Sequence, residues 1–345
     1  IFEDMLEEVA RLYGYDRLPF TLPANSSRPG QLTEKQLLKR KIKHYLQGAG
    51  LTETITYSLT NKEYSQKLLS PEVAEKDVKA IQLSMPMSED HQYLRLSMLP
   101  ELLRTVSYNH ARKETNIAYY EVGSVFLTDE DILTKQPHEQ LRLSGVLTGS
   151  WLDHQWQQDK KDVDFYVVKG IVDGLFKFLE LPVAYQQVKI NDMHPGRCAM
   201  LTVHDDVIGF IGQLHPAFAS DLDLKETYVF DINLEFVLNR VKNEPTYRPI
   251  PRYPSVTRDI AFIVDEHIHA GDIKAVIERV GSALVKNVDI FDVYKGENLD
   301  EGKKSIAYSL HFQHSERTLK DDEVDELYQE IVNQVNEKFG SYVRS

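Results

Sequence analysis

The chain has 345 residues and a formal net charge of −13, with 42% hydrophobic and 27% charged residues, a composition typical of a globular protein with two or three domains. The acidic excess argues against a general nucleic-acid binder, because phosphate contacts need clustered lysine and arginine side chains. No apolar run is long enough to cross a bilayer, and the single cysteine, Cys198, excludes an internal disulfide framework and suits a reducing cytoplasm.

The first predicted element is an amphipathic helix over residues 2–13. On the face opposite its apolar stripe, Asp4, Glu7 and Glu8 are spaced i, i+3 and i+4, so their carboxylates share one side of the helix. Such oxygen ligands suit a hard cation such as Mg²⁺. From the residues alone we favour the simpler interpretation, an acidic first turn that complements the helix dipole and pairs with Arg11.

The middle of the chain predicts a mixed domain in which strands gather with helices between them. A capping box at Thr33 and Gln36 opens a helix, and the β-branched run 52–60 predicts a strand. The absence of regular βαβ alternation favours an α+β domain with an antiparallel sheet. Further strands are predicted at 117–127, 141–148, 184–190, 198–204, 207–213 and 227–232, and helices at 168–179, 216–221 and 234–241.

A proline-rich segment between Pro245 and Pro254 predicts a domain boundary. The residues beyond it follow the order strand, helix, strand, strand, helix, strand, with the helices near 270–280 and 321–338. This order is the ferredoxin-like βαββαβ layout. The fold class expected for the whole chain is therefore α+β, with an antiparallel-sheet domain followed by a ferredoxin-like domain.

The last domain has features that bear on nucleic-acid binding. Residues 249–345 contain 12 Lys+Arg and 18 Asp+Glu, so even this domain is acidic. The face of its third strand that points away from the helices shows Ser305, Ala307, Ser309 and His311, with no aromatic platform for stacking bases. We therefore expect phosphate contacts from cations at the rim of the sheet, although an ordinary solvated side chain is the simpler interpretation of each one. The candidates are Arg252, Arg258, Lys286, Lys295, Lys303, Lys304, Arg317 and Lys320.

Motifs in three parts of the chain carry a family resemblance. Residues 3–15 read EDMLEEVARLYGY, and the last domain opens with 251–264, PRYPSVTRDIAFIV. Between them lie 86–89 (PMSE), 94–100 (LRLSMLP), 120–126 (YEVGSVF), 194–197 (HPGR) and 212–216 (GQLHP). In this order and spacing they resemble the beta chain of bacterial phenylalanyl-tRNA synthetase. Met85 and Glu101 depart from the family, which usually has Asn and Gly there.

The resemblance implies a division into three parts. Residues 1–20 would be the end of the family's B5 domain, and 21–245 a non-catalytic domain (B6–B7) with the class II synthetase fold. Residues 250–345 would be the ferredoxin-fold anticodon-binding domain (B8). The chain would then be a C-terminal fragment of a larger polypeptide.

Class II adenylation needs one arginine on the ATP α-phosphate and another, after a Gly-rich turn, on the γ-phosphate. The strand that resembles the class II motif reads Tyr119-Tyr120-Glu121, without the Phe-Arg-x-Glu pattern, and residues 231–236 contain no Gly-rich turn. Arg240 lies in an ordinary amphipathic helix. We therefore expect no catalytic residue here and an inactive fragment.

The resemblance also implies the cofactors and partners. The alpha subunit would bind ATP and phenylalanine, and the two subunits would form a cytoplasmic α₂β₂ tetramer that docks tRNA(Phe). In the family, the positions of Asp4, Glu7 and Glu8 bind Mg²⁺ shared with the alpha subunit, and one further ligand lies upstream of this fragment. Two other functions stay open: an active single-chain class II synthetase, and a stand-alone tRNA-binding or interaction protein.

Overall fold

The computed structural model describes residues 1–22, 30–154, 156–157, 159–241, 247, 249–281, 284–296 and 299–343. The chain divides into two compact units, Ile1–Glu244 and Pro245–Ser345. Pro245, which the sequence places at the domain boundary, lies outside the described residues. No helix among the described residues has the length and apolarity needed to span a bilayer.

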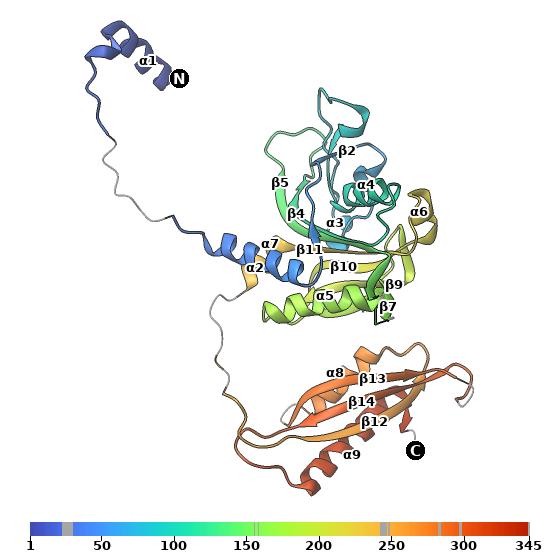
Figure 1. Ribbon diagram of the computed structural model, residues 1–345. Coiled ribbons are helices and arrows are strands. Elements are labelled where there is room, and N and C mark those ends of the chain that lie inside the picture. Colours follow the sequence, from blue (N-terminus) through green and yellow to red (C-terminus); the bar gives the residue numbers. More distant parts are fainter. Residues whose placement is uncertain are drawn as a thin grey trace. The chain divides into compact units, whose positions relative to one another are not determined.

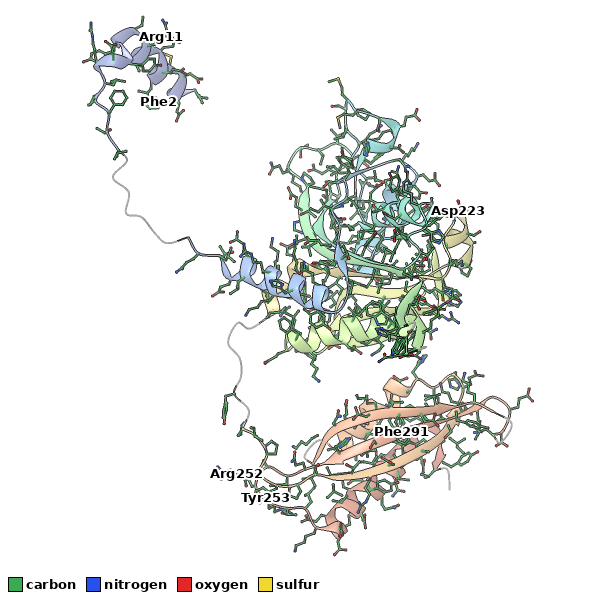
Figure 2. All side chains as sticks on the ribbon, viewed as in Figure 1. Phe2, Arg11, Asp223, Arg252, Tyr253 and Phe291 are labelled. Carbon is green, nitrogen blue, oxygen red and sulfur yellow. The ribbon has the colours of Figure 1, made fainter. Side chains whose placement is uncertain are left out.

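The chain opens with helix α1 (Phe2–Tyr13), followed by the short helix η1 (Tyr15–Arg17). The apolar stripe predicted for α1 is present and exposed, with Phe2, Met5 and Leu12 each more than half accessible to solvent. Figure 2 shows Phe2 and Arg11 projecting from this helix. Gly14 ends α1 with a φ of 99°, a left-handed conformation that favours glycine.

Unit 1 is built on a sheet whose strands are nearly all antiparallel, as predicted (Figure 1). Only β1 and β4, among the described strands of this sheet, pair in parallel. In spatial order the strands are β1 (Thr52–Glu53), β4 (Ile117–Leu127), β5 (His138–Thr148), β11 (Thr227–Asn233), β10 (Asp206–Leu214), β9 (Met193–Val203) and β8 (Ala184–Gln187). Two small ladders pair β2 (Leu59–Thr60) with β3 (Tyr93–Leu94), and β6 (Ser150–His154) with β7 (Asp159–Asp162).

Helices cover both faces of this sheet. One face carries Tyr120, Leu143 and Phe230 and packs on α2, α5 and α7. The other face carries Val146 and Phe210 and packs on α4 and α6. The helices are α2 (Glu34–Gly48), α3 (Pro71–Ala74), α4 (Leu99–His110), α5 (Phe165–Phe178), α6 (Pro216–Asp221) and α7 (Leu234–Arg240), with the short η2 (Tyr64–Gln66) and η3 (Glu89–His91).

One predicted strand of unit 1 is wrong. The run 52–60 forms two short strands, β1 and β2, with an irregular segment between them. In that segment the hydroxyl of Thr56 and the carbonyl of Tyr57 turn toward the guanidinium of Arg95. The backbone therefore leaves the ladder, although its β-branched composition is typical of a strand.

Unit 2 has the predicted βαββαβ order. Its sheet runs β13 (Val285–Tyr294), β14 (Lys303–Phe312), β12 (Val256–Asp265) and β15 (Tyr342–Val343), with antiparallel pairs throughout the described strands. Helices α8 (Ala270–Val280) and α9 (Asp321–Phe339) pack on one face, where Ile260, Phe262 and Tyr308 lie in the core. The opposite face of the sheet carries neither helix.

Candidate nucleic-acid interface

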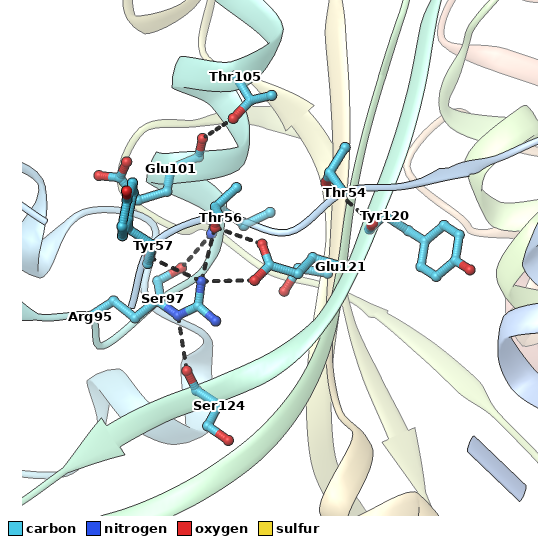
Figure 3. A network of polar contacts seen from close by, with 12 residues as sticks. Thr54, Thr56, Tyr57, Arg95, Ser97, Glu101, Thr105, Tyr120, Glu121 and Ser124 are labelled. Carbon is cyan, nitrogen blue, oxygen red and sulfur yellow. Dashed lines mark hydrogen bonds and ion pairs between the residues drawn. The ribbon is translucent and has the colours of Figure 1, made fainter. Parts of the chain in front are cut away.

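A buried ion pair joins two of the sequence motifs in unit 1 (Figure 3). Arg95 follows β3, and Glu121 lies in β4; their side chains are 3% and 4% exposed. Arg95 Nη1 donates to Glu121 Oε1 at 3.0 Å and to Thr56 Oγ1 at 2.9 Å, while Nε donates to the Ser124 carbonyl at 2.9 Å. Thr56 Oγ1 in turn donates to Glu121 Oε2 at 2.6 Å. Both charges are thus paired and hydrogen-bonded, which a buried ion pair requires.

A glycine makes room for this pair. A Cβ added at Gly123 would lie 2.4 Å from Arg95 Nη2 and 2.9 Å from the sulfur of Met98. The guanidinium therefore lies directly over the backbone of β4. This part of the sheet is filled by the chain's own side chains.

A second buried arginine lies on the same face of the sheet. Arg142 in β5 is held between Glu72 of α3, at 2.8 Å, and Asp231 of β11, at 2.6 Å. Arg142 Nη2 and Asp231 Oδ2 form an ion pair without a hydrogen bond between them. Burial acts to lower the pKa of Arg142, and the two carboxylates outweigh it and raise that pKa. Arg95 and Arg142 are thus both committed to carboxylates of this chain.

The acidic face of α1 has a local partner. Glu8 Oε2 lies 2.6 Å from Arg11 Nη2. In the part of the chain that the structure describes, no group of three or more Asp, Glu, His or Cys side chains is placed to hold a metal ion. The carboxylates of Asp4, Glu7 and Glu8 suit a hard cation in donor type, but the three do not form a metal site by themselves.

The eight candidate cations of unit 2 do not form one patch. Three of them, Lys295, Lys303 and Lys304, lie where β13 ends and β14 begins. The other five lie at or before the first residues of β12 and β13, or between β14 and α9: Arg252, Arg258, Lys286, Arg317 and Lys320. Since β14 runs antiparallel to both neighbours, these two groups lie at opposite ends of the sheet.

Several of these cations already contact carboxylates. Lys303 lies 3.3 Å from Asp265, Arg317 lies 2.6 Å from Glu323, and Lys295 pairs with Glu266. Such exposed pairs are weak and exchange readily with other partners.

Two of the cations are placed differently. Arg258 points to the helix-covered face, where it lies 3.7 Å from Asp321 and 3.6 Å from Asp325 of α9. Lys304 donates to the carbonyl of Glu266 at 2.8 Å, and burial, followed by the neighbouring Lys295, lowers its pKa.

The uncovered face of the sheet carries aromatic side chains that strand parity missed. Tyr294 of β13 pairs with Ser305 of β14, Ser305 with Ile263 of β12, and Ile263 with Tyr342 of β15. Directly paired residues point to the same face, so the two tyrosines stand at the ends of one row across the sheet. Lys303 Nζ lies 5.5 Å from the centre of the Tyr342 ring.

The uncovered face of β14 lacks an aromatic platform, as predicted, but the strands β13 and β15 add Tyr294 and Tyr342 to the same face. A bulge at Ile290–Asp292 shifts the alternation of β13, and β15 has only two residues. Neither position shows a clear period of two in the sequence. The residues at this face that our sequence reasoning missed are Tyr294, Tyr342 and Ile263.

Comparisons with known proteins match both units. The family described as "Phenylalanyl tRNA synthetase beta chain CLM domain" matches residues 18–234, and the family described as "Ferredoxin-fold anticodon binding domain" matches residues 251–344. The first match covers more than half of the chain.

Bacterial relatives align with nearly the whole chain. Proteins named phenylalanine–tRNA ligase beta subunit are 55% identical in Oceanobacillus iheyensis, 50% in Geobacillus kaustophilus and 45% in Listeria monocytogenes. The alignments cover 100%, 100% and 99% of this chain and 42% of each relative. The chain thus spans about two fifths of the length of these curated relatives.

Proposed function

We propose that this chain, which belongs to the phenylalanyl-tRNA synthetase beta-chain family, is the scaffolding and tRNA-docking part of a phenylalanine–tRNA ligase. The observation that carries the proposal is the uncovered face of unit 2, where Tyr294, Tyr342 and Lys303 surround one row of the sheet. Unit 2 also matches a family described as an anticodon-binding domain. Aromatic rings stack on unpaired bases, and adjacent cations hold the backbone.

The chemistry would come from another subunit. Class II adenylation uses arginines that hold the phosphates of ATP. On the sheet of unit 1, Arg95 and Arg142 are instead buried against Glu121, Glu72 and Asp231. We therefore assign ATP and phenylalanine to an alpha subunit, in a cytoplasmic α₂β₂ enzyme.

Phosphate contacts would come first from the cations nearest the tyrosine row. Lys295 directly follows Tyr294, and Lys303 lies over Tyr342. Lys304 is next in sequence but points to the helix-covered face, where its partner Val264 lies in the core. The tRNA phosphates would replace Asp265 and Glu266 as partners of these lysines. The five cations at the other end of the sheet, Arg252, Arg258, Lys286, Arg317 and Lys320, would contact the backbone farther from the bases.

The acidic face of α1 would contribute to a magnesium site. Asp4, Glu7 and Glu8 supply oxygen ligands on one side of an exposed helix, and Mg²⁺ keeps several ligands from water or other groups. Because the three carboxylates do not close a site themselves, the remaining ligands would come from elsewhere in the assembly. A bound Mg²⁺ would join this helix to the alpha subunit.

Reconstitution of the full-length beta subunit with the alpha subunit tests the proposal. We expect the double variant Tyr294→Ala/Tyr342→Ala to lose tRNA affinity while phenylalanine-dependent ATP–pyrophosphate exchange continues at the wild-type rate. Exchange activity in the 345-residue chain alone would refute the assignment of catalysis to another subunit. Unchanged tRNA affinity in the double variant would refute the docking face.

A further inference from the structure

Unit 1 has a pocket of about 370 Å³ that neither of the two buried arginines lines. It is lined by the end of α4, the turn that follows it, the corner between β5 and β6, strand β7 and the residues just before β11. The size falls in the range of small-molecule and group-binding sites. The charges and donors of the lining decide which chemistry it would bind.

Three basic side chains meet at this pocket: His110, Lys160 and Lys225. They come from positions 50 and 65 residues apart along the chain, so only the tertiary structure brings them together. Within the described part of the chain, none of the three side chains forms an ion pair or hydrogen bond, in contrast to Lys295, Lys303 and Arg317 of unit 2. Asp153 faces Lys160 across the β6–β7 hairpin, but the two do not form an ion pair.

The two acidic side chains of the pocket are occupied. Asp162 Oδ1 accepts a hydrogen bond from Ser150 Oγ at 2.8 Å. Glu226 Oε2 accepts one from Tyr228 OH at 3.1 Å, and its Oε1 lies 3.8 Å from Arg197. Hydrogen bonds from Ser150 and Tyr228 leave both carboxylates charged, but the charge of Glu226 is offset by Arg197. Lys160 and Lys225 then outnumber Asp162, so the lining offers an excess of positive charge to a ligand in a chain whose net charge is −13.

Neutral donors complete the lining. Thr115 contributes a hydroxyl, and Asn116 contributes an amide whose Oδ1 accepts from the backbone N–H of Ser150 at 2.9 Å. With its oxygen engaged, Asn116 has its NH₂ group left to donate. Lysine, threonine and asparagine side chains are among the groups that contact phosphate oxygens in proteins.

We propose that this pocket binds a phosphate group, with Lys160 and Lys225 as its charged ligands and Thr115 and Asn116 as neutral donors. The phosphate is presented either by an RNA backbone or by a small phosphate compound, since both offer the same oxygens. The inference does not depend on the function proposed above, because none of the residues used for that function lines this pocket.

The test uses the 345-residue chain and two probes, inorganic pyrophosphate and an RNA hairpin. The pocket variant is Lys160→Ala/Lys225→Ala, and the matched control is Lys76→Ala/Lys189→Ala, which removes the same charge from exposed positions of unit 1 outside the pocket. Both pairs are made also in a chain that carries Tyr294→Ala/Tyr342→Ala, so that RNA binding by unit 2 does not mask the pocket. Binding is measured by calorimetry at several salt concentrations.

We expect the pocket variant to bind at least one probe about tenfold or more weakly than the control variant does. For RNA, the slope of log affinity against log salt should fall by about 2, one for each lysine removed. Loss with both probes assigns a small phosphate compound, and loss with RNA alone assigns a backbone phosphate. Equal binding by pocket and control variants, or no binding of either probe by the wild-type chain, overturns the proposal.

Discussion

Arg95 Nη1 and Glu121 Oε1 lie 3.0 Å apart in unit 1, and both side chains are almost completely withdrawn from water. The two residues are 26 positions apart in the sequence and belong to two different motifs. Their pairing ties the segment after β3 to the edge of the main sheet. Because a buried charge is tolerated only with its partner in place, each residue makes the other necessary.

We predict that Glu121→Ala lowers the free energy of unfolding by about 3–5 kcal/mol, because Arg95 would stay buried without its counter-charge. Urea denaturation monitored by circular dichroism measures the change. Glu8→Ala, which breaks the exposed pair with Arg11, serves as the control and should change little. A variant that replaces both Arg95 and Glu121 with apolar residues of similar size should lose less unfolding free energy than Glu121→Ala alone. A larger loss of unfolding free energy in the double variant would contradict this explanation.

Gly123→Ala should also destabilise unit 1, by about 1–3 kcal/mol, because the new methyl group would overlap the Arg95 guanidinium. Gly170 in α5 is the matched control: a Cβ there meets no atom within 4 Å. Gly170→Ala should stabilise the protein by about 0.5–1 kcal/mol through helix propensity. Thermal denaturation of the two variants decides the matter, and equal effects would refute the steric explanation.

The tyrosine row should be detectable through stacking. We expect Tyr294→Ala and Tyr342→Ala each to weaken tRNA binding by the reconstituted enzyme by about 1–3 kcal/mol, the amount found for stacking of one base on an aromatic ring. Tyr294→Phe and Tyr342→Phe keep the ring and should bind nearly as the wild type does. If the phenylalanine variants lose as much affinity as the alanine variants, the hydroxyl groups and not the rings contact the RNA.

The two groups of cations in unit 2 should behave differently. We expect the triple variant Lys295→Ala/Lys303→Ala/Lys304→Ala to bind tRNA more weakly. The slope of log affinity against log salt concentration should become shallower by about 0.7–0.9 for each phosphate that is no longer neutralised. Arg258 is paired with Asp321 and Asp325 on the helix-covered face, so Arg258→Ala should have the smaller effect. Filter binding over a range of salt concentrations measures both. A larger effect of Arg258→Ala would move the docking surface to the other end of the sheet.

Cys198 provides a pH-dependent test of the core of unit 1. Burial raises the pKa of its thiol from the usual 9.0 to about 12, so the folded state keeps the proton that the unfolded chain releases near pH 9. The protonated thiol therefore contributes its full share to the unfolding free energy below pH 9, and this contribution is lost as the pH rises from 9 toward 12.

Comparison of unfolding free energies for the wild type and Cys198→Ala between pH 8 and about 11 isolates the thiol. As the pH rises, the unfolding free energy of the wild type should fall relative to that of Cys198→Ala. A difference that stays constant would show that the thiol ionises equally in both states.

The sequence predicts the elements of unit 2 well, because their signals are local. Periods of 3.6 and of two residues mark the helices α8 and α9 and the strands β12 and β14, and the ferredoxin-like order follows from them. The motifs around Arg95, Glu121 and Pro251 were enough to identify the family, which the comparisons confirm. The acidic balance of the chain is likewise a property of composition alone.

Which residues come together at the candidate site depends on contacts between segments that are distant in sequence, and no local pattern encodes such contacts. The run 52–60 has the composition of one strand, yet Thr56 and Tyr57 lie outside the ladder and accept hydrogen bonds from the Arg95 guanidinium. The bulge in β13 and the short β15 bring Tyr294 and Tyr342 into one row. Pairing register sets which side chains share a face, and a shift of one residue reverses it. For this reason residue types and order indicated the family, and only the folded sheet showed which aromatic side chains share its uncovered face.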